Sequence, residues 1–147
     1  MVDLTKMHKT GFLYKKSSGR GVLRQHIWKR RHVDCTRTEL KYFDSERDES
    51  PRGSLDLTIC RVRDVHVMPD MEANAGKSAS PKWHVAIQTP DQRFDFAADT
   101  EVEMLEWVAL LRAIFDANER YLLHQDNFSD ESRSFALRHL KRLDTNC

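Results

Sequence analysis

A group of basic residues near the start of the chain is spaced so that it could bind an anion. Lys15 ends a short apolar segment, and Lys29-Arg30-Arg31 lies within a second segment. Ammonium and guanidinium groups donate charge-assisted hydrogen bonds, and the planar guanidinium fits the oxygens of a phosphate. The intervening loop adds further basic side chains, namely Lys16, Arg20, Arg24 and His26. This pattern indicates a phosphate-binding site, and the alternative is a solvated basic hairpin with no specific ligand.

Strand alternation decides which of these cations can act together. In an extended chain Leu13 and Lys15 share one face, and Lys29, Arg31 and Val33 share one face of the next segment. If Leu13 and Val33 point into the core, the three cations point the same way. Full burial of three charges would be prohibitive, so we expect them at an open end of the sheet, near the loop of residues 16–27.

The charge of the chain is distributed unevenly along its length. A net charge of +1 combines residues 1–43, with eleven Lys/Arg and three Asp/Glu, and residues 95–131, with two Lys/Arg and ten Asp/Glu. Such a dipolar molecule has one pole suited to anions. The near neutrality of the whole argues against a general nucleic-acid binder, which usually carries a basic excess.

The elements that would position the cations are short strands followed by a helix. Alternating apolar residues predict strands over 11–16, 27–36, 40–43, 53–57, 60–67, 83–87 and 94–96, the fifth with a bulge near Asp64. Strands of this length and spacing favour a mainly β, antiparallel barrel or sandwich. Apolar residues at intervals of three and four then predict one helix, and they are Met104, Trp107, Val108, Leu111, Ile114 and Phe115.

The ends of this helix carry signals of their own. Thr100 with Glu103 forms a capping-box pattern at its start. The helix is expected to continue past Leu122 and to stop at a polar break over residues 126–132. We therefore expect one domain over 8–125 and, over 126–147, a polar linker with a short basic tail that has a helical pattern. That tail would dock on the barrel, lead into a neighbouring domain or lie on an anionic membrane.

Other residues with chemical potential are better interpreted as core. Trp107 lies at the centre of the apolar helix face, and Cys35 and Cys60 lie within apolar patterns. Among possible metal ligands, His26, His32 and Cys35 are nearest in sequence, but His32 and Cys35 fall on opposite strand faces. The sequence contains no G-x-S-x-G, H-E-x-x-H or P-loop motif. We expect neither an enzyme nor a bound metal or cofactor.

Five segments in order resemble the pleckstrin homology family, over roughly residues 9–116. They are Gly11-Phe-Leu-Tyr-Lys15, Trp28-Lys-Arg-Arg31, Leu40-Lys-Tyr-Phe43, Pro51-Arg-Gly-Ser-Leu55 and the final helix with Trp107. The resemblance implies a seven-stranded antiparallel barrel capped by one C-terminal helix. It also implies a phosphoinositide site in which Lys15, Lys29 and Arg31 contact the headgroup, assisted by Tyr42 and Arg52.

The resemblance implies recruitment of a cytoplasmic protein to membranes. Basic loop residues Arg20 and Arg24 would join the headgroup site, Lys16 and Arg30 would attract anionic lipid without specificity, and Val22 and Leu23 would insert into the bilayer. The run before Arg52 is acidic, which opposes a highly charged headgroup; it contains Asp44, Glu46, Asp48 and Glu49. The alternative function is a protein-interaction module on the same fold that binds a small GTPase, a peptide or a neighbouring domain.

Overall fold

One antiparallel sheet and one long helix make up the fold in a computed structural model, which describes residues 6–17, 27–68 and 83–144. In chain order the strands are β1 (Lys9–Lys16), β2 (Trp28–Cys35), β3 (Glu39–Phe43), β4 (Gly53–Asp56), β5 (Val65–Met68), β6 (Trp83–Gln88) and β7 (Arg93–Ala98). Two short 3₁₀ turns, η1 (Leu57–Ile59) and η2 (Val62–Asp64), separate β4 from β5, and the helix α1 covers Glu101–Asp144. The predicted fold class is confirmed.

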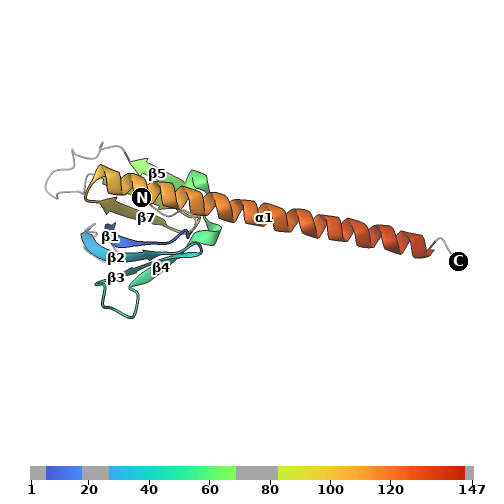
Figure 1. Ribbon diagram of the computed structural model, residues 1–147, viewed down its shortest axis with the longest axis horizontal. Coiled ribbons are helices and arrows are strands. Elements are labelled where there is room, and N and C mark those ends of the chain that lie inside the picture. Colours follow the sequence, from blue (N-terminus) through green and yellow to red (C-terminus); the bar gives the residue numbers. More distant parts are fainter. Residues whose placement is uncertain (1–5, 18–26, 69–82, 145–147) are drawn as a thin grey trace.

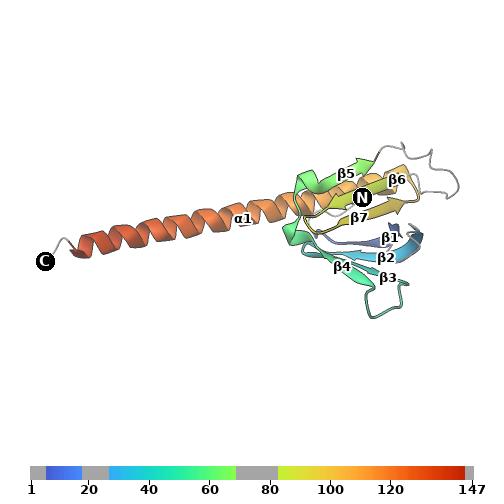
Figure 2. The same ribbon diagram turned by 180° about the vertical axis from the view of Figure 1, so that it is seen from behind.

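The seven strands form a single sheet in the order β4-β3-β2-β1-β7-β6-β5. Every pairing between the described strands is antiparallel, and β1 lies in the middle, bound to β2 on one side and to β7 on the other. This order makes β4 and β5 the two edges of the sheet. The sheet bends around its own inner face (Figure 1). The helix α1 runs across the open side of this bent sheet (Figure 2).

Alternation along the strands sorts the side chains as predicted. Leu13 on β1 and Val33 on β2 are buried and point into the same core. Trp107 of α1 is 4% exposed in that core, and it packs so close to Gly11 that a Cβ there would lie 3.4 Å from its ring. The Thr100 hydroxyl accepts a hydrogen bond from the Glu103 amide at 3.2 Å and caps the helix. The core positions predicted on the helix, including Met104, are confirmed.

The predicted fifth strand over 60–67 is wrong in its first half. Residues 57–64 form two 3₁₀ turns, and only Val65–Met68 pairs with β6. Each turn is organised by an aspartate, because Asp56 Oδ1 accepts from the Thr58 amide at 2.9 Å and Asp64 Oδ2 from the Arg61 amide at 2.7 Å. These side-chain hydrogen bonds replace those of a strand.

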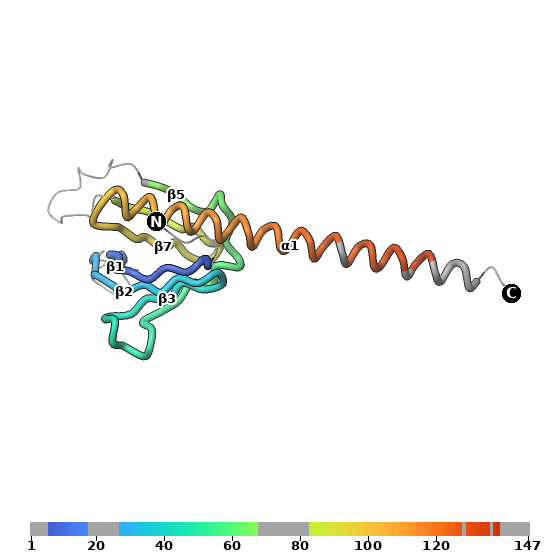
Figure 3. Tube along the Cα trace, viewed as in Figure 1, coloured from blue at the N-terminus to red at the C-terminus, as the bar shows by residue number. Residues whose placement is uncertain are grey.

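The predicted break in the helix over residues 126–132 is also wrong. The helix α1 continues without interruption to Asp144. Its coloured part already extends far beyond the sheet in Figure 3. Contact with the sheet ends near Asn118, whose amide donates to the Arg37 carbonyl at 3.0 Å. The polar residues end the buried face of the helix but not its backbone, because the segment contains no glycine or proline.

Candidate functional site

The hairpin of β1 and β2 brings the predicted cations together beyond the end of the core. Leu13 lies opposite Arg31 across the hairpin, and Lys15 lies opposite Lys29. Directly opposed residues project from the same face, so these three cations share the inner face with buried Leu13. The sheet extends past its apolar filling at this point, and the charged side chains are therefore not sealed in the core.

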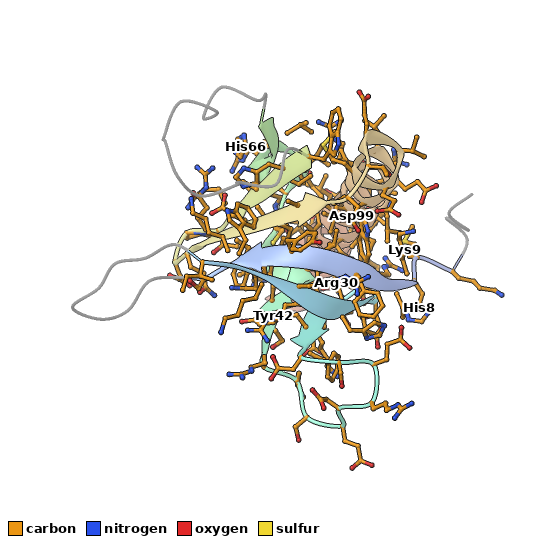
Figure 4. All side chains as sticks on the ribbon, turned by 90° about the vertical axis from the view of Figure 1, so that its left-hand side faces the viewer. His8, Lys9, Arg30, Tyr42, His66 and Asp99 are labelled. Carbon is orange, nitrogen blue, oxygen red and sulfur yellow. The ribbon has the colours of Figure 1, made fainter. Side chains whose placement is uncertain are left out.

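An open cavity of about 170 Å³ lies at this end of the sheet. Its lining residues are Lys15, Ser17, Lys29, Arg31, Tyr42 and Arg52. Five of these six residues were predicted to form the headgroup site, and they come from β1, β2, β3 and the residue just before β4. In the end-on view of Figure 4, the labelled Tyr42 lies in the half of the bent sheet formed by β2, β3 and β4, away from α1. We call this cavity the basic pocket.

Lys15 is a partly buried cation of the basic pocket. Its ammonium lies 4.9 Å from the centre of the Tyr42 ring and 5.6 Å from that of Phe94, and it donates to the Lys16 carbonyl at 3.3 Å. Burial lowers the pKa of Lys15, and the positive charge of Arg31 lowers it further. An anion entering the basic pocket would relieve both effects, because it would favour the charged ammonium.

Asp44 pairs with two of the pocket's arginines. Its Oδ1 forms an ion pair with Arg31, and its Oδ2 accepts from Arg52 Nε at 2.6 Å. Asp44 follows β3 directly, so the turn that brings Arg52 to the pocket also brings this carboxylate. The carboxylate occupies the position between two guanidinium groups that a phosphate oxygen would need. The sequence alone showed an acidic loop but not this bridging contact.

Tyr42 and Gly53 fix the shape of the pocket wall. The two residues lie opposite each other on β3 and β4, and a Cβ on Gly53 would overlap the Tyr42 hydroxyl. The glycine therefore lets the phenol ring lie flat over β4. The Arg52 amide also donates to the Tyr42 carbonyl at 2.8 Å, and this hydrogen bond holds Arg52 beside the pocket.

Lys16 and Arg30 point to the outer face of the sheet, as alternation predicted. The Arg30 guanidinium lies 4.0 Å from the centre of the Phe12 ring, and the Lys16 ammonium lies 5.9 Å from that of Trp28. Neither residue lines the basic pocket. The remaining predicted contact residues, Arg20, Val22, Leu23 and Arg24, lie outside the described residues.

A second polar group, which sequence reasoning did not find, lies on the outer face of β6 and β7. His84 Nε2 and Arg93 Nε both contact Asp95 Oδ1, at 2.9 and 3.1 Å, and the Trp28 ring packs edge-on against His84. Burial raises the pKa of the Asp95 carboxyl, but its hydrogen bonds to His84 and Arg93 outweigh burial and leave the pKa below its usual value. The sequence signal that could have indicated this cluster is the position of His84 and Asp95, because each lies next to an apolar core residue, Val85 or Phe94, in an alternating strand.

The cysteines are packing residues, as predicted. Cys35 and Cys60 are fully buried, and burial raises the pKa of their thiols to about 12 and about 11. Within the described ranges, no three His, Cys, Asp or Glu residues gather closely enough to hold a metal ion.

Comparison with known proteins assigns the family. The family model described as "PH domain" matches residues 7–115. The chain belongs to the PH domain family. A PH domain is a non-catalytic module, and members of the family commonly bind lipids or inositol phosphates.

Similar sequences occur in proteins of different length. A PH and Rap-GAP domain-containing protein of Dictyostelium discoideum is 25% identical over 126 residues, which are 86% of this chain but only 9% of that protein. The C-terminal PH domain of human pleckstrin is 24% identical, with a TM-score of 0.57 over 75% of this chain and 88% of its own.

Two further structures agree in fold. A C-terminal pleckstrin PH domain in complex with D-myo-Ins(1,2,3,5,6)P5 has a TM-score of 0.55 at 24% identity, covering 72% of this chain and 92% of its own. A structure of SifA and SKIP has a TM-score of 0.55 at 19% identity, covering 74% and 97%. Among the described residues, no helix is both long and apolar enough to cross a bilayer.

Proposed function

We propose that this PH domain binds a phosphoinositide headgroup in the basic pocket and thereby recruits its protein from the cytoplasm to an anionic membrane. The observation that carries the proposal is the convergence of Lys15, Lys29, Arg31 and Arg52 on one open cavity. Asp44 carries one negative charge against the four cations of the pocket, so the pocket retains a positive excess.

Each pocket residue would have a distinct part in binding. The Arg31 and Arg52 guanidinium groups would donate paired hydrogen bonds to a ring phosphate, while Lys15 and Lys29 would act as point charges on a second phosphate. Tyr42 would offer its hydroxyl to a ring substituent, because its ring is held over Gly53. No step in this scheme requires bond making or breaking, so we propose no catalytic activity and no cofactor.

Binding requires Asp44 to give way. Its carboxylate forms ion pairs with Arg31 and Arg52 and would repel a phosphate at the same position. Because Asp44 is 41% exposed, it can turn toward solvent without a change in the strands. We infer that a headgroup exchanges for this carboxylate, which keeps weakly charged anions out of the pocket.

The test uses neighbouring cations that strand alternation separates. Lys15→Ala and Arg31→Ala remove inner-face cations, whereas Lys16→Ala and Arg30→Ala remove the same charges from the outer face. Binding of the four variants is measured by co-sedimentation with vesicles that contain phosphoinositide or only phosphatidylserine. We expect a loss of roughly tenfold or more for each inner-face variant on phosphoinositide, about 1.4 kcal/mol per decade. The outer-face variants should lose less and should respond alike to both lipids.

A protein-interaction module is the second candidate function. The observation that favours it is the structure of SifA and SKIP, which contains two proteins and shares the fold of this chain. Wild-type protein that binds neither vesicle type but associates with a protein partner, such as a small GTPase, would support this candidate. Equal losses for all four variants on both lipids would instead indicate a diffuse basic surface and contradict the pocket.

A further inference from the structure

The part of α1 beyond the sheet extends away from the described strands (Figures 1 and 2). Every side chain that the structure describes from Arg120 to Arg138 is exposed. This extension, residues 120–144, spans about 37 Å at 1.5 Å per residue. Most helical stability in proteins comes from packing of an apolar face, and this extension does not pack on the described strands.

The extension exposes apolar side chains that would normally be covered. Tyr121 is 57% exposed, and Phe135 is 63% exposed although it lies on the same helical face, fourteen residues further on. Residue 128, midway between them, is also a phenylalanine in the sequence. A spacing of seven along a helix is typical of a seam that packs against another helix.

The charges of the helix are divided between its two halves. Residues 119–131 contain one Lys/Arg and four Asp/Glu, whereas residues 132–144 contain four Lys/Arg and one Asp/Glu. Two such helices side by side in parallel would place acidic against acidic and basic against basic. In the antiparallel arrangement each acidic half lies against a basic half, so the helix is complementary to its own copy.

We propose that the extension pairs with that of a second copy of this chain in an antiparallel two-helix dimer. A two-fold axis near residues 131–132 would place Phe135 of each copy beside residue 128 of the other. The same axis would bring Asp130 close to Arg133 of the second copy. Such an interface is self-complementary, as two-fold symmetry requires. The two barrels then lie at opposite ends of the pair, and both basic pockets remain open.

The oligomeric state of the full chain tests the pairing. We expect sedimentation velocity to show a monomer at about 1 µM and a growing dimer toward about 200 µM, as for an association with a Kd of about 50 µM. Asp126→Lys with Asp130→Lys, and separately Arg133→Glu with Arg138→Glu, should each reduce dimer formation at least tenfold. An equimolar mixture of the two variants should restore the dimer, because each altered half then meets an opposite charge.

A matched control separates the helix from the net charge. Arg47→Glu with Arg63→Glu changes the net charge by the same amount as Arg133→Glu with Arg138→Glu, but on exposed residues of the barrel. This variant should leave the dimer intact. Circular dichroism confirms that each variant keeps its helix. A chain that stays monomeric to about 200 µM, or charge variants that dimerise as well as wild type, would overturn the proposal.

Spin labels determine the direction of pairing. With Cys147 changed to Ser, labels at Arg120→Cys should lie about 35 Å apart along an antiparallel pair, and labels at Ser132→Cys should lie close to the axis. A parallel pair would give the same short distance at both positions and would refute the antiparallel model. A monomer whose labels lose mobility only on phosphatidylserine vesicles would point to a membrane-facing helix instead.

Discussion

Asp44 offers the sharpest test of how the basic pocket works. Changing Asp44 to Asn keeps the shape of the side chain but removes the charge that pairs with Arg31 and Arg52. We expect the variant to bind inositol phosphates more tightly than wild type, because the ligand no longer displaces a carboxylate. Most substitutions in a binding site weaken binding, so this expected sign is informative.

The size of the effect follows from the exposure of the two ion pairs. Arg52 is 58% exposed, and a pair of this kind contributes about 0.2–1 kcal/mol. Arg31 is only 14% exposed, so its contact with Asp44 resembles a charge-assisted hydrogen bond, which contributes about 1.5–3 kcal/mol. Because Asp44 is itself exposed, we take the lower end of that range for this contact. When the ligand displaces Asp44, hydration of its carboxylate offsets part of the free energy of these two ion pairs. We expect a net gain of about 1.4–2.3 kcal/mol, which is roughly 10–50-fold in affinity.

The free protein should respond in the opposite direction. Without the carboxylate, the repulsion between Arg31 and Lys15 is less well compensated, and the free energy of unfolding should fall by about as much as the affinity rises, about 1–2 kcal/mol. The variant is therefore expected to be less stable alone and more stabilised by ligand. Thermal denaturation with and without ligand measures both effects.

Isothermal titration with inositol 1,3,4,5-tetrakisphosphate provides the affinity, and Glu46→Gln is the matched control. Glu46 lies in the same loop and is exposed, and its replacement changes the net charge by the same amount. Its effect should be small and should vanish at high salt, because it acts only through screened repulsion. If Asp44→Asn binds no more tightly than Glu46→Gln, the carboxylate does not compete for the pocket. If it binds more weakly than wild type, Asp44 positions the arginines for the ligand.

Two further predictions concern the framework of the site. Gly53→Ala should lower the midpoint of thermal unfolding by several degrees, because the added methyl group overlaps Tyr42 and overpacking costs about 1–3 kcal/mol. A variant as stable as wild type would show that the Tyr42 ring moves freely. Asp95→Asn should change the acid response. The pKa of Asp95 is lower in the folded state than its ordinary 3.8, so its ionisation stabilises the fold above that value, and the contribution is lost as pH falls toward the folded pKa. Urea midpoints between pH 2.5 and 6 should fall less steeply in the variant than in wild type, and parallel curves would contradict this account.

Much of the fold and half of the pocket could be predicted from local sequence. Alternation along β1 and β2 is a property of any extended backbone, so buried Leu13 and Val33 determine that Lys15 and Arg31 share their face. The same rule places Arg30 on the opposite face, where it packs on Phe12. These positions need no knowledge of distant residues.

Two elements were predicted wrongly because the apolar pattern is only one of the forces on the backbone. Residues 60–64 alternate like a strand, yet the Asp64 carboxylate captures the Arg61 amide and forms a 3₁₀ turn. Residues 126–132 are polar, yet they remain helical, since polarity ends burial without breaking the hydrogen bonds of a helix.

What the sequence by itself determined is therefore the identity of the elements and the direction of their side chains. Only the tertiary structure decided how charges from different elements meet. Asp44 and Arg31 lie thirteen residues apart on separate elements, and the pairing of β2 with β3 brings them into contact. His84 and Asp95 likewise meet only because β6 pairs with β7. Such contacts depend on the register between strands, which long-range pairing sets and no local pattern encodes.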